Sequence, residues 1–197
     1  MTELQTTTTY FKKPGKSNTE RALDLAMARA GELGIRKIIV ATTAGDTGAA
    51  AAQKFRDFDV FAVTHSTGFK KANEQELEEE NREAIEEAGA RILTCQHAFG
   101  GVNRAVRKKF DTTELDEIIA HTFRRFGEGM KVVVEIALMA ADAGLVRTDE
   151  AVMCIAGTGR GADTVVVLKP ANAQTFFEVE VLEVVCRPAP SHPGFSD

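Results

Sequence analysis

The chain lacks tryptophan, has one tyrosine and three cysteines, and contains no run approaching the roughly 18 consecutive apolar residues of a membrane helix. The number of cysteines is odd and none has CxxC spacing, which argues against a disulfide framework and a zinc site; they are Cys95, Cys154 and Cys186. The formal net charge of -5 lacks the electrostatic signature of nucleic-acid binding. The stretch from Met1 to Gln5 has no signal pattern. We expect a cytoplasmic protein with no nucleic-acid or membrane partner.

What the sequence does contain is an alternation of apolar strands and amphipathic helices. A length of 197 residues suits one α/β domain, which we place at 1–187, with a flexible tail at 188–197. Expected strands are 6–11, 37–42, 60–64, 91–94, 151–156, 164–168 and 176–186; expected helices are 18–32, 47–55, 74–88, 102–110, 115–126 and 130–143. Such alternation predicts right-handed βαβ units and a parallel sheet covered by helices. Ligands of these sheets bind beyond the carboxyl ends of the strands.

The loop after strand 37–42 is the main candidate for binding a phosphate. Its glycines allow close backbone approach, its threonines offer hydroxyl donors, and the first amides of the next helix point outward. The candidate residues are Thr43, Ala44, Gly45, Asp46, Thr47 and Gly48. The alternative is a plain capped turn, with Asp46 or Thr47 as the N-cap.

Two further loops follow expected strands and carry candidate ligand contacts. The first combines glycines with a hydroxyl and an arginine suited to a phosphate, and comprises Gly157, Thr158, Gly159, Arg160, Gly161 and Asp163. Its alternative is a flexible hairpin-like turn. The second, from His65 to Phe69, supplies an imidazole, two hydroxyls and an aromatic ring, and its candidate residues are His65, Thr67, Gly68 and Phe69. Its alternative is a polar loop in which His65 contacts no ligand.

Other signals do not define a site. Gly15-Lys16-Ser17 fails as a P-loop because the required earlier glycine is Tyr10. No pair of histidines or carboxylates has metal-ligand spacing, and no residues can be assigned a catalytic role.

Residues 38–50 (IIVATTAGDTGAA) and 60–64 (VFAVT) resemble the C-terminal α/β domain of pyruvate kinase, as do 143–145, 149–152, 157–164 and 167–170. The resemblance covers roughly residues 18–170 and implies a three-layer sandwich with a mainly parallel five-stranded core of order 3-2-1-4-5, plus extra terminal strands. In some pyruvate kinases this region binds a sugar bisphosphate, and the domain contributes oligomer contacts. The catalytic barrel is absent, so kinase activity is not implied, and Asp46 stands where the family often has arginine. Whether the chain is an enzyme stays open.

A partial similarity to the flavodoxin phosphate loop, Thr-x-Thr-Gly-x-Thr before a helix, runs from Thr43 to Thr47. It implies FMN as the first candidate among small phosphorylated ligands, with Phe69 packing against the flavin ring. The alternative is a domain without catalytic activity that senses a sugar phosphate or mediates oligomerisation, and a homo-oligomer is a further expectation.

Overall fold

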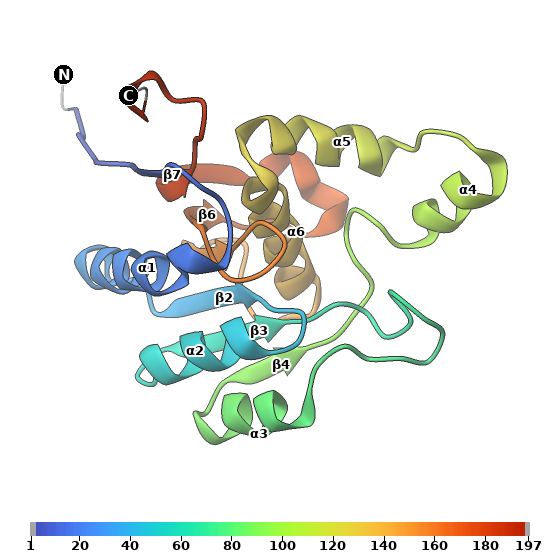
Figure 1. Cartoon of the computed structure of the whole chain (residues 1–197), viewed down its shortest axis with the longest axis horizontal. Helices are drawn as coiled ribbons and strands as arrows, with labels where there is room; N and C mark the ends of the chain where they lie inside the picture. Colours follow the sequence, from blue (N-terminus) through green and yellow to red (C-terminus); the bar gives the residue numbers. More distant parts are fainter. Residues whose placement is uncertain (1–2, 196–197) are drawn as a thin grey trace.

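The computed structural model describes residues 3–195, which form one seven-stranded sheet with helices on both faces (Figure 1). The strand order is β1-β7-β6-β5-β2-β3-β4. The strands are β1 (Thr9–Phe11), β2 (Lys37–Ala41), β3 (Asp59–Val63), β4 (Arg91–Leu93), β5 (Val152–Ala156), β6 (Thr164–Lys169) and β7 (Glu180–Pro188). When the strands β2 to β6 are numbered one to five along the chain, their order in the sheet is 3-2-1-4-5. The strand order predicted from the sequence is therefore confirmed.

Strand direction divides the sheet in two. The strands β4, β3, β2 and β5 are parallel, whereas β6 runs antiparallel to β5 and β7 antiparallel to β6. The core is therefore mainly parallel, as expected, and β6 is its antiparallel member. Only the turn at 157–163 separates β5 from β6, and a parallel connection needs a crossover of a dozen or more residues. The edge strand β1 returns parallel to β7.

The helices cover the two faces unequally. Helices α1 (Thr19–Leu33), α2 (Asp46–Lys54) and α3 (Glu79–Glu87) lie on one face, and α6 (Glu128–Asp142) lies on the other (Figure 1). Ile38 and Val40 of β2 belong to the first core, while Ile39 between them belongs to the second. Successive strand side chains point to opposite faces, so a strand buried on both sides reads as a continuous apolar run.

Two further helices, α4 (Val102–Phe110) and α5 (Leu115–Phe123), follow β4 and extend from the body of the domain (Figure 1). Helix α4 buries none of its residues. A short 3-10 turn, η2 (Arg124–Phe126), joins α5 to α6. Within residues 3–195, none of the helices has the length and apolar character needed to cross a membrane.

Three expected elements begin later than the sequence indicated, and the first of them, β1, starts at Thr9 rather than at residue 6. Helix α3 starts at Glu79 because the preceding residues bond to other loops: the Glu78 amide donates to the Ala44 carbonyl at 3.0 Å, and the Gln75 side chain to the His65 carbonyl at 3.1 Å. Residues 173–178 form a 3-10 helix, η3, rather than the start of β7. The carboxylate of Asp142 accepts two hydrogen bonds at the start of this turn, one from the Asn172 side chain and one from the Ala173 amide.

The flexible tail at 188–197 stays a prediction, and its last two residues lie outside the described part of the chain. Within that part, the Ala189 amide donates to the Phe11 carbonyl at 3.0 Å, and the ring of His192 stacks on Tyr10. A short 3-10 turn, η4 (Pro193–Phe195), follows.

Candidate functional site

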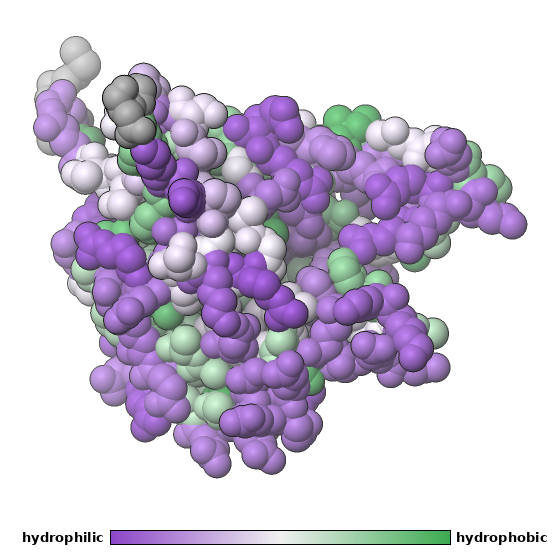
Figure 2. Space-filling model, viewed as in Figure 1, coloured by the Kyte–Doolittle hydropathy of each residue, from purple (hydrophilic) through white to green (hydrophobic). Residues whose placement is uncertain are grey.

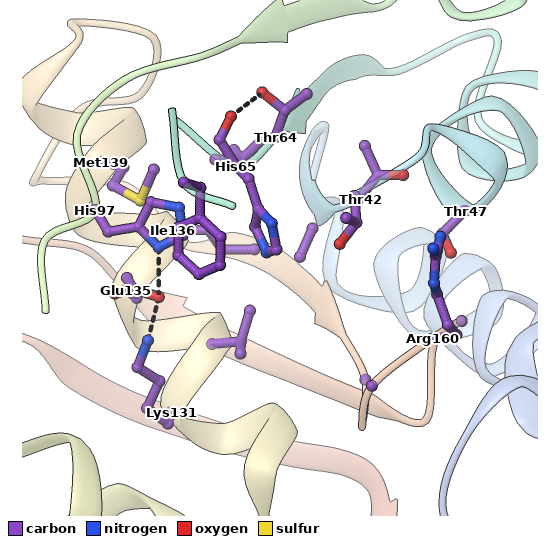
Figure 3. A pocket seen from close by; sticks show the side chains of 18 of the residues that line it. Thr42, Thr47, Thr64, His65, His97, Lys131, Glu135, Ile136, Met139 and Arg160 are labelled. Carbon is purple, nitrogen blue, oxygen red and sulfur yellow. Dashed lines mark hydrogen bonds and ion pairs between the residues drawn. The ribbon is translucent and has the colours of Figure 1, made fainter. Parts of the chain in front are cut away.

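A cavity of about 200 Å³ lies at the carboxyl ends of β2, β3 and β5 (Figure 3). The ends of these strands and the loops that follow them form one part of its wall, and the segment after β4, α4, η2 and α6 contribute the rest. Of the candidate residues, those that line it are Thr43, Asp46, Thr47, His65, Phe69, Gly157, Gly159, Arg160 and Gly161. The three loops singled out in the sequence therefore meet at one cavity.

The glycines of the first loop have a packing role. Gly45 has φ of +107°, and a Cβ there would lie 2.4 Å from the Cβ of Asn81. A Cβ at Gly48 would lie 3.0 Å from both Ile85 and Thr42, whose Oγ1 accepts the Gly48 amide at 3.2 Å. Like Ala44, these two glycines do not line the cavity. They let the loop pack under α3.

Asp46 lies on the cavity wall, but its charge is compensated. Its carboxylate accepts a hydrogen bond from the Lys16 ammonium at 3.0 Å. This bond from Lys16, together with the Thr47 amide, holds the pKa of Asp46 below its ordinary value. Lys16 therefore compensates the charge of the carboxylate that would repel an anion.

Asp163 organises the second loop from inside the protein. It is fully buried, and its Oδ2 accepts the amides of Gly15 at 2.8 Å and Thr158 at 3.1 Å, while Oδ1 accepts the Thr164 hydroxyl at 2.8 Å. Asp163 and Thr158 do not line the cavity. Gly161 packs against the N-terminal segment, where its Cβ would lie 2.5 Å from the Cα of Lys16. These contacts fix the loop that carries Arg160.

The third loop packs as an aromatic cluster. The Phe69 ring contacts the imidazoles of His65 and His97, with centroids 4.1 and 4.9 Å away, and the Arg104 guanidinium lies 4.4 Å from its centroid. His65 Nδ1 is hydrogen-bonded to the Glu76 carboxylate at 2.7 Å. The cluster holds the loop against α4.

Thr67 and Gly68 line a second, more open cavity of about 650 Å³ between this loop, the segment after β4 and α4. Phe69, His97 and Arg104 belong to the walls of both cavities. Figure 2 shows the recess between the two projecting parts of the surface.

Sequence reasoning missed a buried charged group on α6. Lys131 and Glu135 are 7% and 3% exposed, form an ion pair one helical turn apart, and line the cavity. Glu135 also accepts the Phe99 amide at 3.0 Å, and His97 Nδ1 lies 3.7 Å from its carboxylate (Figure 3). The available signal was the spacing itself, since two opposite charges four residues apart interrupt an otherwise apolar helix.

Burial shifts the pKa of two residues of this cluster, His97 and Lys131. It lowers the pKa of His97 to about 4, although the Glu135 carboxylate acts in the opposite direction. The neutral ring fits its contacts, because Nε2 accepts the Ser66 amide at 3.3 Å and the proton is left on Nδ1, facing Glu135. Burial also lowers the pKa of Lys131, against the influence of Glu135.

Two cations of the cavity wall form no ion pair in the described part of the chain, although Arg160 is near enough to Asp46 to help lower the pKa of that carboxylate. Within residues 3–195, neither Arg104 nor Arg160 forms an ion pair, whereas Arg124 pairs with Glu128 at 2.9 Å. In the same residues, no group of three or more His, Cys, Asp or Glu side chains could hold a metal ion. The fold and cavity define an α/β domain with a small, positively charged cavity at the carboxyl ends of its parallel strands.

The chain belongs to the pyruvate kinase alpha/beta domain family, whose family model matches residues 20–168. The resemblance seen in the sequence is thereby confirmed. Similar solved structures include two of O-ureido-L-serine synthase, one of them a mutant with O-ureido-L-serine bound; each has 16% sequence identity. The matches cover 70% and 69% of this chain and 49% and 50% of the synthase chains, with TM-scores of 0.32 and 0.31. This chain thus spans about half of their length, and such TM-scores carry no argument about function.

Proposed function

We propose that this domain binds a small phosphorylated ligand in the cavity beyond β2, β3 and β5. The observation that carries the proposal is the unpaired guanidinium of Arg160, which shares the wall with the hydroxyls of Thr43 and Thr47. In the described part of the chain, no hydrogen bond occupies either hydroxyl, although Thr47 is only 4% exposed. Arginine is suited to phosphate, and the start of α2 adds the positive end of a helix dipole.

Cavity size and packing favour a compact ligand, such as a sugar phosphate, over FMN. A volume of about 200 Å³ is below the roughly 300–1,000 Å³ of typical cofactor and drug sites. The Phe69 ring, which was expected to face a flavin, already packs against two imidazoles and a guanidinium. FMN binding remains a testable alternative: purified protein would show the visible absorbance of an oxidised flavin and release FMN on denaturation.

Calorimetric titration with glycerol 3-phosphate tests the proposal. Arg160→Gln removes an exposed charge, so we expect about tenfold weaker binding, as for one lost charge-assisted hydrogen bond, with unchanged thermal stability. Arg125→Gln is the matched control, because Arg125 is also exposed but lies off the cavity wall. Equal affinities in the wild type and Arg160→Gln, or no binding by either, would contradict the proposal.

The second candidate function, a regulatory or oligomerisation domain, is favoured by apolar exposure on α4 and α5. Val102, Phe110, Leu115 and Ile118 are each more than half exposed, at 69%, 69%, 68% and 56%. Single apolar surface residues are ordinary, but four exposed ones on two successive helices suit a protein partner. A mass measured by light scattering that stays monomeric at high concentration would argue against self-association.

A further inference from the structure

The cations of the cavity fall into two sets on opposite sides. Arg160 lies beside Thr47. Across the cavity, Lys131 and Glu135 of α6 lie beside His97, which belongs to the segment after β4 (Figure 3). Arg104 joins the α6 side from α4, where it and Arg124 are near enough to lower the pKa of Lys131. A ligand that fills the cavity would therefore meet positive charge at two separate ends.

On the α6 side, one cation among the described residues lacks an ion pair. Lys131 pairs with Glu135 and Arg124 with Glu128, whereas Arg104 has no such partner within residues 3–195. The neutral His97 adds no charge. One negative charge on the ligand would balance this side.

Lys131 has donor capacity left for that charge. Its ammonium has three hydrogens, and the Glu135 carboxylate is the one hydrogen-bond acceptor it meets within residues 3–195. The side chain is 7% exposed and borders the cavity, so its remaining donors have little access to bulk water. A buried ammonium with free donors favours an anionic acceptor.

We infer that the ligand is a compact phosphorylated carboxylate, with its phosphate at Arg160 and its carboxylate at Lys131 and Arg104. This inference rests on the proposed function and names the ligand class. A carboxylate carries the single charge that the α6 side lacks. A second phosphate would bring up to two charges close to Glu135, whose carboxylate repels them.

Two probes isolate the carboxylate. Glycerol 3-phosphate and 3-phosphoglycerate are three-carbon phosphate monoesters. They differ at one carbon, which is a hydroxymethyl group in the first and a carboxylate in the second. In calorimetry on the full chain, 3-phosphoglycerate should bind at least about tenfold more tightly than glycerol 3-phosphate, because one hydrogen bond between charged groups contributes about that factor. Fructose 1,6-bisphosphate should bind more weakly than 3-phosphoglycerate.

The double variant Lys131→Met/Glu135→Gln removes the ion pair without leaving a buried charge. In this variant, the ratio of the affinities for 3-phosphoglycerate and glycerol 3-phosphate should fall to near one. Lys37→Met is the control, because Lys37 pairs with Glu150 at 2.6 Å but begins β2, at the end of the sheet opposite the cavity. Its ratio should match the wild type. If the double variant fails to fold, Arg104→Gln on α4 replaces it, with the same expected fall.

The outcomes separate the two proposals. If both probes bind with equal affinity, or the bisphosphate binds best, the carboxylate inference is overturned and phosphate binding stands. A preference for 3-phosphoglycerate that survives the loss of Lys131 or Arg104 also overturns it. If no probe binds, the proposed function itself fails.

Discussion

The buried carboxylate of Asp163 allows a quantitative test of how the second loop is held. In Asp163→Ala, the amides of Gly15 and Thr158 and the hydroxyl of Thr164 lose their acceptor together. Each hydrogen bond to a charged group is worth about 1.5–3 kcal/mol. Gly15 and Thr158 are only half-buried, so water can replace part of the loss, and the cost of burying the charge disappears. We expect a net loss of about 3–5 kcal/mol in the free energy of unfolding.

Asp163→Asn separates the acceptor from the charge. The amide oxygen can keep the Gly15 and Thr158 bonds, and the Thr164 hydroxyl can rotate to accept from the new amide nitrogen. We expect a loss of about 1–2 kcal/mol for this variant. Urea unfolding followed by circular dichroism measures both values, with the slope against urea showing whether the two-state treatment holds. A loss below about 1 kcal/mol in the alanine variant, or equal losses in both, would refute the reasoning.

Three further predictions concern the same region. Gly45→Ala should lower the free energy of unfolding by more than about 2 kcal/mol, because the new Cβ would collide with α3. Gly159 also has positive φ but faces open space, so Gly159→Ala should lower the free energy of unfolding by about 1 kcal/mol. Equal losses in urea unfolding would contradict the packing role of Gly45. The pKa of His97 in the folded protein is about 4, below its ordinary value. As the pH falls, the unfolded chain therefore binds the proton first, and the free energy of unfolding should decrease by about 3 kcal/mol between about pH 6.5 and pH 4. His97→Gln should remove this decrease. In Lys16→Met, the pKa of Asp46 should rise toward its ordinary value in an NMR titration, while stability changes by less than about 1 kcal/mol because the pair is partly exposed; an unchanged pKa would exclude Lys16 as the cause.

The sequence could predict the strand order and the meeting of three loops because both depend on local signals. Apolar runs such as Ile38 to Val40 identify buried strands, and glycine-rich turns mark the loops between elements. The direction of β6 was also within reach, since the turn at 157–163 is too short for a crossover.

The rest depends on contacts between distant parts of the chain. Nothing local shows that Gly45 meets Asn81, or that Asp163 bonds to Gly15, since these pairs are far apart in sequence. The Lys131 and Glu135 pair was hidden by the apolar character of its helix. A charge inside an apolar helix is informative only once its buried face is known.

The bonds from the N-terminal segment to the second loop also bear on how relatives should be compared. All residues that line the smaller cavity lie between 41 and 161, inside the matched range 20–168. Two contacts that hold the loop, from Gly15 to Asp163 and from the Ala162 amide to the Thr19 hydroxyl, involve residues before that range. A fragment trimmed to the matched range would keep every wall residue, yet lose these anchors and the β7 strand beside β6. Relatives that share the wall but differ before residue 20 could therefore have cavities of different shape.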